Sequence, residues 1–445
     1  MRRIVSWMIM VLFLVGTLTL AFNIRLVNAQ AETIYINSDG SVSPSSAPIS
    51  TVDNVTYTLT DNIVNTSITV ERDDILIAGA GFALQGSGVG TGIDLSGRTN
   101  VTIQFMEIEG FRYEISLENS TNNNILNNSV TDSDGFGILI YDSLSNSIYG
   151  NDVVMSTQAI PEPGSGGSGI CILSSNYTMV SGNTVENTYE GIQLQDSYLN
   201  NVSRNSLKGN YYGIGVVDSN CSNISENIVT VGITGIDLER CSDIIVSGNN
   251  ITENSNDGVT LYPGALSNVL YSNFVENNSH GINLWEASSN SIFHNDFVNN
   301  SQQVYIIASG YNNSWDDGYP SGGNYWSDYN GADFYSGPYQ NVSGSDGIGD
   351  TPYVINSENR DNYPLFPADK MRDLMIEEYQ GLVSTYQSLN SSYNELQSKQ
   401  ETTTNTLNLI RNLMYIFIAT TIIFIAATVY FRTRKLRAKP ETKTT

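Results

Sequence analysis

Short runs in which apolar and polar residues alternate recur along the central part of the chain. Ile192 and Leu194 flank a glutamine, and Ile214 and Val216 flank a glycine. A period of two residues is the pattern of a β-strand with one buried face. The runs are too short, and too often interrupted by glycine and asparagine, to be helices. The pattern therefore predicts many short strands around a common core.

Glycines precede these runs at a constant spacing. From residue 169 onward the spacing is 22 or 23 residues, and a Pro/Gly/Ser-rich stretch at 161–168 explains a longer step before it. A fixed period of this length is typical of a solenoid, in which each repeat contributes one coil. We expect each glycine to supply a turn conformation that a side chain would hinder. The glycines are Gly92, Gly137, Gly169, Gly191, Gly213, Gly235, Gly258 and Gly281.

Asparagines and small residues repeat with the same period. We expect the asparagines to adopt left-handed backbone conformations and to exchange amide hydrogen bonds between coils, and the small residues to point inward. Together the repeats predict an all-β, right-handed parallel β-helix of about 22 residues per coil over 66–303. The asparagines are Asn128, Asn151, Asn183, Asn205, Asn227, Asn249, Asn273 and Asn295, and the small residues are Ser143, Ser175, Ser197, Ser219, Cys241 and Ala287.

The two ends of the chain carry signals of export and membrane anchoring. A basic start, an apolar run at 4–20 and small residues at Val27 and Ala29 predict a signal peptide over 1–29, with an uncleaved anchor as the alternative. Residues 413–431 are uncharged and mostly apolar, and this segment is long enough for a transmembrane helix. Basic residues follow at once, so we expect the tail 432–445 to be cytoplasmic and the preceding domain to be extracellular.

Charge and cysteine content narrow the possible partners. The chain has 45 acidic and 20 basic residues and a net charge of -25, which argues against nucleic acid and polyanionic substrates and favours cations. Its 3 cysteines are too few for a disulfide framework, so stability must come from a packed core. Glycosylation sequons suit a cell-surface glycoprotein. They include Asn54, Asn65, Asn100, Asn119, Asn176, Asn201, Asn250 and Asn341.

Three further segments flank the predicted repeats. Residues 30–65 are expected to form an N-terminal cap, and residues 304–367, rich in aromatic, glycine and acidic residues, a C-terminal cap over the last coil. After residue 367 apolar residues follow a heptad spacing, which predicts a coiled-coil-like stalk over 368–412. The stalk either joins chains into a homo-oligomer or stays a single amphipathic helix.

Several motifs resemble a known family, the NosD-like β-helix proteins of the pectin-lyase-like superfamily, in the form found on archaeal cell surfaces. The resemblance covers about 32–367 and implies a right-handed parallel β-helix and a link to copper-site maturation. The motifs are IYINSDGSV at 34–42, VERDDILIAGAG at 70–81, GIDLSG at 92–97, GGNYWSDYN at 322–330, DGIGDTPY at 346–353 and DNYPL at 361–365.

The residues themselves do not favour copper, which requires clustered His, Cys or Met donors. The two histidines, His280 and His294, fall at different corners of neighbouring coils. Cys241 takes an inward small position, Cys171 an outward strand position and Cys221 a turn. We therefore expect no copper site.

The outward positions two and four residues after each glycine are where a ligand site is expected, because stacked coils hold their side chains about 5 Å apart. Carboxylates and aromatic rings meet there, a combination that suits a sugar or a cation, whereas an ordinary solvated sheet face is the alternative. As catalysts the carboxylates lack any sign of desolvation. The predicted ligand-binding residues are Gln193, Gln195, Asp237, Glu239, Tyr262 and Trp285, and Asp237 and Glu239 are the catalytic candidates.

A second candidate site lies in the predicted C-terminal cap. Asp346 and Asp350, with glycines between them, resemble a calcium loop, although two acids fall short of an EF-hand. Taken together, the sequence predicts a membrane-anchored extracellular protein that is structural or binds carbohydrate or a cell-envelope polymer, and that is not an enzyme. A polysaccharide-active enzyme is the alternative, and a copper-linked accessory protein is a third.

Overall fold

The computed structural model describes residues 32–155, 167–308 and 310–366, and helical residues between 382 and 421. The chain divides into two compact units, Met1–Pro367 and Ala368–Thr445. The predicted signal peptide and the basic tail lie outside the described residues, as does most of the stretch at 161–168.

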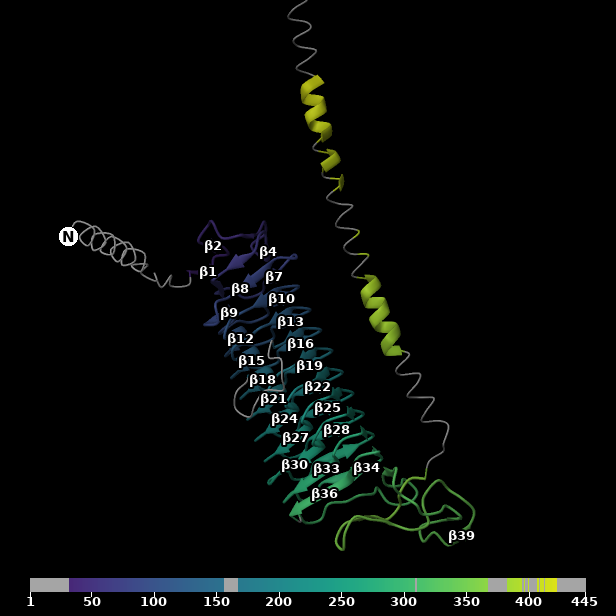
Figure 1. Ribbon diagram of the computed structural model, residues 1–445. Helices are drawn as coiled ribbons and strands as arrows, with labels where there is room; N and C mark the ends of the chain where they lie inside the picture. The colour runs from purple at the N-terminus through teal and green to yellow at the C-terminus, as the bar shows by residue number, and fades with distance from the viewer. Residues whose placement is uncertain are drawn as a thin grey trace, which may run out of the picture. The chain divides into compact units, whose positions relative to one another are not determined.

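The first unit is a stack of coils whose strands form three long sheets, and each coil from β6 to β35 contributes one strand to each sheet (Figure 1). Successive strands of a sheet come from successive coils and pair in parallel, and antiparallel pairing in these sheets occurs only at the start, in β1–β2 and β3–β4. This is a parallel β-helix of the right-handed type, as the repeat predicted.

We call the 13-stranded sheet, in which the repeat glycines lie, sheet A. In spatial order its strands are β2 (Val42–Ser43), β1 (Glu32–Ile36), β6 (Thr66–Val70), β9 (Thr91–Asp94), β12 (Tyr113–Glu118), β15 (Phe136–Tyr141), β18 (Ser168–Leu173), β21 (Glu190–Gln195), β24 (Tyr212–Val217), β27 (Thr234–Glu239), β30 (Asp257–Leu261), β33 (His280–Trp285) and β36 (Gln302–Ala308).

Sheet B has 12 strands. They are β3 (Ile49–Ser50), β4 (Thr56–Leu59), β7 (Leu76–Ala78), β10 (Thr102–Gln104), β13 (Asn124–Leu126), β16 (Ser147–Tyr149), β19 (Met179–Ser181), β22 (Asn201–Ser203), β25 (Asn223–Ser225), β28 (Ile245–Ser247), β31 (Val269–Tyr271) and β34 (Ser291–Phe293).

Sheet C also has 12 strands. They are β5 (Ile63–Val64), β8 (Ala83–Gln85), β11 (Glu107–Glu109), β14 (Ser129–Thr131), β17 (Asp152–Val154), β20 (Thr184–Glu186), β23 (Ser206–Lys208), β26 (Ile228–Thr230), β29 (Asn250–Thr252), β32 (Phe274–Glu276), β35 (Asp296–Val298) and β37 (Tyr325–Trp326).

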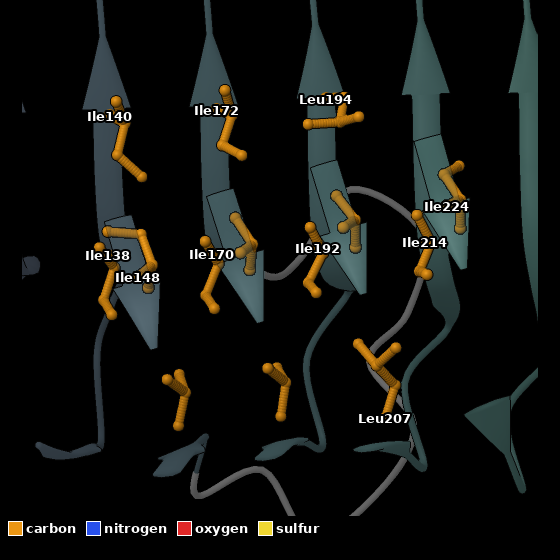
Figure 2. Close-up of a cluster of buried hydrophobic side chains, with 14 of the residues drawn as sticks. Ile138, Ile140, Ile148, Ile170, Ile172, Ile192, Leu194, Leu207, Ile214 and Ile224 are labelled. Carbon is orange, nitrogen blue, oxygen red and sulfur yellow. The ribbon is translucent and has the colours of Figure 1, made fainter. Parts of the chain in front are cut away.

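Equivalent residues of successive coils lie side by side. Ile192 pairs with Ile214, and Ile214 with Ile236, so the sequence period becomes the register of the sheet. These side chains are fully buried and form rows along the stack, as Figure 2 shows for Ile170, Ile192 and Ile214. Burial of each such side chain stabilises the fold by about 1.5–3 kcal/mol, and only the stack provides the interior in which they are buried.

The repeat glycines do not have the role that the sequence suggested. Gly191 and its equivalents lie inside strands of sheet A, and they are absent from the residues with positive φ. A Cβ atom on Gly191 would lie 2.5 Å from the Gly213 carbonyl oxygen and 2.6 Å from the Leu207 side chain. The prediction of a turn was therefore wrong, and glycine is required because neighbouring coils and the core approach closely there.

The asparagine ladder is confirmed, but its backbone conformation is not left-handed. Asn205 donates from its backbone N–H and from Nδ2 to Oδ1 of Asn227, both at 2.9 Å, and also from Nδ2 to the Val180 carbonyl at 3.0 Å. The left-handed residue is the one before it, Arg204, with φ 58°. Each asparagine thus satisfies backbone groups at a bend that the preceding residue makes.

The last coil is covered by residues that depart from the repeat. Trp326 stacks on Phe297 at 4.7 Å between ring centroids, and Tyr353 stacks on Trp326 at 4.4 Å. The Asp361 carboxylate accepts bonds from Trp326 Nε1 at 2.9 Å and from the Asn324 N–H at 2.7 Å. Short antiparallel pairs complete this region: β38 (Tyr335–Ser336) with β39 (Val342–Ser343), and β40 (Tyr353–Val354) with β41 (Arg360–Asp361).

The described part of the second unit is helical, chiefly over 382–393 and 413–421. None of the helices that the structure describes combines the length and the hydropathy of a membrane span. The predicted span, 413–431, is described only as far as residue 421. The stalk predicted over 368–412 is likewise described only in part, and its self-association stays a prediction.

Candidate functional site

Three columns of side chains run along the outer face of sheet A from β18 to β33. Because Ile236 and Leu238 are fully buried in the core, Asp237 and Glu239, which alternate with them, point outward. The residue before the glycine reaches the same face, since Ser168 Oγ donates to Gln193 and Glu190 lies beside Gly215. The first column precedes the repeat glycine, and the other two follow it by two and four residues. The columns contain Ser168, Glu190, Tyr212, Thr234, Asp257 and His280; Cys171, Gln193, Gly215, Asp237, Thr260 and Asn283; and Leu173, Gln195, Val217, Glu239, Tyr262 and Trp285.

Asp237, in the middle column, is buried although it lies on the outer face. Its exposed fraction is 7%, and its Oδ1 atom has no hydrogen-bond partner among the described residues. Burial raises the pKa of this carboxyl well above its usual value, and the nearby carboxylates of Glu239, Glu190 and Asp257 raise that pKa further. The sequence had given no sign of this desolvation.

Asp257 and His280 form a hydrogen-bonded pair on adjacent strands. His280 Nδ1 lies 2.7 Å from Asp257 Oδ1, and the other carboxylate oxygen accepts from Thr260 Oγ1 and from Asn283 Nδ2, both at 2.9 Å. Since Asp257 accepts all of these bonds, we assign the imidazole proton to Nδ1, which leaves Nε2 free of this pair. The imidazole also stacks on the Tyr305 ring, with 4.5 Å between centroids.

Glu190 lies close to the gap left by Gly215 in the middle column. A Cβ atom at position 215 would be 3.3 Å from Glu190 Oε1, so glycine leaves room for this carboxyl between Gln193 and Asp237. Burial raises the pKa of Glu190 to about 7, although a hydrogen bond from Ser168 Oγ at 3.2 Å opposes the rise. Glu190 therefore changes its charge near neutral pH.

Aromatic rings surround these acids. Tyr262 and Trp285 lie in the third column with 5.8 Å between ring centroids, and Trp285 remains 40% exposed. Tyr211 and Tyr212 pack edge to face at 4.8 Å, and Tyr189 lies 5.2 Å from Tyr211. Burial and then Asp237 raise the pKa of Tyr262 to about 12. The rings thus shield the acids and still offer exposed aromatic surface.

The six residues predicted to bind a ligand lie on this face in different environments. Gln193 Oε1 accepts from Ser168 Oγ at 2.9 Å and from Cys171 Sγ at 3.2 Å, and Gln193 Nε2 donates to Gln195 at 3.4 Å. Glu239 is paired with Arg240, which also binds Asp218. Of the two catalytic candidates, only Asp237 is therefore both buried and without a cationic partner among the described residues.

The sequence analysis missed the column that precedes the glycines. It placed His280 at a turn because it assigned the turn to Gly281, whereas both residues belong to β33. Glu190, Tyr212 and Asp257 occupy the equivalent position in other coils. The signal was present as a polar or aromatic residue immediately before each glycine. We call Glu190, Tyr212, Asp237, Asp257, Tyr262, His280 and Trp285 the outer site.

The two aspartates of the proposed calcium loop hold backbone amides. Asp350 accepts from the N–H groups of Phe334 and Tyr335, both at 2.9 Å, and Asp346 accepts from those of Gly337 and Ile348, both at 3.2 Å. The described residues contain no group of three or more His, Cys, Asp or Glu side chains placed to hold a metal ion. In this arrangement the two carboxylates order a loop.

The soft donors that copper prefers do not come together among the described residues. His280 is bonded to Asp257 on sheet A, whereas His294 Nε2 lies 2.8 Å from the Ser321 carbonyl oxygen. Cys171 and Cys241 are buried, and Cys221 is exposed. These residues do not fit a copper centre, and we derive no chemical step through one.

Solved structures with a similar fold include a periplasmic alginate epimerase, AlgG, at 14% identity over 60% of this chain and 80% of the epimerase, with a TM-score of 0.41. The mannuronan C-5 epimerase AlgE6 A-module of Azotobacter vinelandii is 14% identical over 58% of this chain and 87% of the module, with a TM-score of 0.36. The tailspike of E. coli bacteriophage HK620, in complex with a pentasaccharide, is 12% identical at a TM-score of 0.41; the match covers 60% of this chain and 55% of the tailspike. Likeness at this level carries no inference about the outer site.

No curated protein matches the chain. The family model described as "Periplasmic copper-binding protein (NosD)" matches residues 28–165 and 162–331, which together make up more than half of the sequence. Its matched region contains the coils and the outer site described above. The chain is a member of the NosD family.

Proposed function

We propose that this protein is a membrane-anchored extracellular β-helix that binds a glycan of the cell envelope at the outer site. One observation carries the proposal: an aromatic pair, the half-buried Tyr262 and the exposed Trp285, lies beside a column of polar side chains on a rigid sheet. Aromatic faces pack against the apolar faces of sugar rings, while neighbouring polar groups fix the orientation of the hydroxyls.

The arrangement of the columns suits a polymer. They run along the axis of the stack and repeat once per coil, about 4.8 Å apart. An extended chain lying along them meets an equivalent position on every coil. Because the side chains stand on paired strands, little conformational entropy is lost when a ligand binds.

Export and anchoring are supported by the two ends of the sequence. The apolar run at 4–20 and the apolar segment 413–431 with its basic tail support a position of the stack outside the membrane. A surface exposed to the envelope is where a protein of this net charge would meet glycans.

A Trp285→Ala variant tests glycan binding. The full chain in detergent, applied to an array of envelope glycans, is expected to bind a subset, and Trp285→Ala to weaken that binding at least tenfold. Tyr271→Ala is the matched control, because Tyr271 is a similarly exposed aromatic residue, 37% against 40%, on sheet B. Equal binding by the wild type and Trp285→Ala, or no binding at all, would refute the proposal.

A polysaccharide-active enzyme is the second candidate, and the Asp257–His280 pair favours it. A carboxylate that fixes the imidazole proton on Nδ1 leaves Nε2 able to exchange a proton with a substrate. Incubation of the bound glycans with the full chain, followed by mass spectrometry, distinguishes the two functions. Unchanged glycan supports binding alone, whereas cleavage or isomerisation that His280→Gln abolishes would establish catalysis.

A further inference from the structure

The outer site contains more hydrogen-bond acceptors than donors. Two buried acceptor atoms of the middle column, Asp237 Oδ1 and Asn283 Oδ1, have no hydrogen-bond partner among the described residues. Thr260, which lies between them, donates its hydroxyl to Asp257 instead. Leaving a buried acceptor without a donor is unfavourable, so a ligand that brings donors gains affinity here.

The site also brings several carboxyl groups together. The groups that face Asp237 are Glu190 from β21, Tyr212 from β24, Glu239 on its own strand, and Asp257 and Tyr262 from β30 and its end. The neighbouring bases are already occupied, since Arg240 binds Asp218 and Glu239, and His280 is bonded to Asp257. A carboxylate or phosphate on a ligand would add both charge and acceptors, and is therefore disfavoured.

We propose that the outer site recognises a free ammonium group on the glycan, so that the ligand is a polymer containing unacetylated amino sugars. This inference rests on the proposed glycan binding and specifies its chemistry. An ammonium group carries three N–H donors and a positive charge, which match Asp237 Oδ1, left without a partner among the described residues, and the carboxyls around it. The rings of Tyr262 and Trp285 add a favourable face for a cation.

Binding of this kind is coupled to proton release. Burial and the neighbouring carboxylates raise the pKa of Asp237, which favours its protonated form in the free site. An ammonium group that reaches Asp237 stabilises the carboxylate, so the proton leaves to the solvent. A ligand of the same length without the ammonium group would not cause this release.

Two hexasaccharides with the same backbone test the inference: β-1,4-linked glucosamine and its fully N-acetylated form. Calorimetric titrations of the full chain at physiological salt, in two buffers with different protonation enthalpies, give both affinity and protons released. We expect the glucosamine hexamer to bind at least tenfold more tightly and to release protons. We expect Asp237→Asn to bind the glucosamine hexamer at least tenfold more weakly than the wild type does.

Asp196→Asn is the control for non-specific attraction to an acidic protein. It replaces the same carboxyl group by an amide at an exposed turn with φ 50°, a conformation that asparagine tolerates. Glu190→Gln provides a second variant if Asp237→Asn fails to fold. Equal losses in Asp196→Asn and Asp237→Asn, equal affinity for the two hexamers, or binding of neither would overturn the inference. The proposed function is tested separately, since a Trp285-dependent neutral glycan on the array would preserve it.

Discussion

Two sets of polar side chains run along the same coils, and they differ in how completely they are bonded. At one bend of each coil the buried asparagines exchange hydrogen bonds with the coils before and after, and Asn227 bonds to Asn205, Asn249 and the Val202 carbonyl. On the outer face of sheet A, the buried carboxyl of Asp237 has an oxygen with no partner in the described chain. The neutral, saturated ladder stabilises the stack, whereas the charged and unsaturated column is available to a ligand.

The difference also appears in the chemistry of the residues. Each asparagine side chain carries both a donor and an acceptor, so one residue per coil can continue a ladder without adding charge. An ionised carboxyl group has acceptors and no donor. Four carboxyl groups, those of Asp237, Glu190, Glu239 and Asp257, gather at one position of sheet A. Such an arrangement does not stabilise the fold, and it supports the functional role that we propose for this face.

The largest expected effect is the loss of one asparagine from the ladder. Asn227→Ala removes the acceptor of the Asn205 N–H and of Asn205 Nδ2, and one donor to the Val202 carbonyl, so two buried donors lose their acceptor. At about 1–3 kcal/mol for each of these two donors, we expect a loss of about 2–6 kcal/mol in the free energy of unfolding, measured by urea titration. Asn330→Ala, at an exposed position, is the control. A loss below 1 kcal/mol would mean that the ladder is not stabilising.

In the outer site we expect a substitution to raise the free energy of unfolding instead of lowering it. The pKa of Glu190 rises from 4.5 to about 7 on folding, so the folded protein binds more protons between these pH values. The contribution of Glu190 to stability is therefore greatest below about pH 4.5, falls as the pH rises to about 7, and stays reduced above it. Glu190→Gln removes this dependence and should stabilise the protein by up to about 3 kcal/mol at pH 8, with little effect at pH 4.

Thermal or urea unfolding of Glu190→Gln at the two pH values measures this difference. Glu253→Gln, which changes an exposed glutamate, is the matched control and should leave the pH dependence as it is in the wild type. If Glu190→Gln destabilised the protein at pH 8, Glu190 would belong with the saturated ladder and the contrast between the two sets would fail.

The fold was predictable from the sequence because each coil repeats the same chemical environment. Ile192, Ile214 and Ile236 fill one row of the core, so their spacing reveals the register directly. The site was predictable only in part. Alternation placed Asp237 and Trp285 on the outer face, but the environment of Asp237 depends on rings and carboxyls from three other coils, which no single repeat contains.

Two further features of the site could not be predicted from the sequence, for a different reason. His280 was assigned to a turn because glycine has more than one structural use, and the close approach of neighbouring coils at Gly281 leaves no separate mark in the sequence. The position of Glu190 beside Gly215 depends on a side-chain rotamer. Local patterns therefore located the surface, and long-range packing determined its chemistry.

The smallest effect is expected where the ladder is made of serine. Ser219 Oγ accepts the Ser197 N–H at 3.0 Å and donates to the Val217 carbonyl at 2.8 Å, yet the equivalent residues two and three coils later are Ala265 and Ala287. Because the stack already accepts alanine at this position, Ser219→Ala should cost only about 1 kcal/mol. Hydrogen exchange of the Ser197 amide should accelerate while distant coils keep their protection. A loss as large as that of Asn227→Ala would show that saturation, not the asparagine side chain itself, determines how much a ladder stabilises the stack.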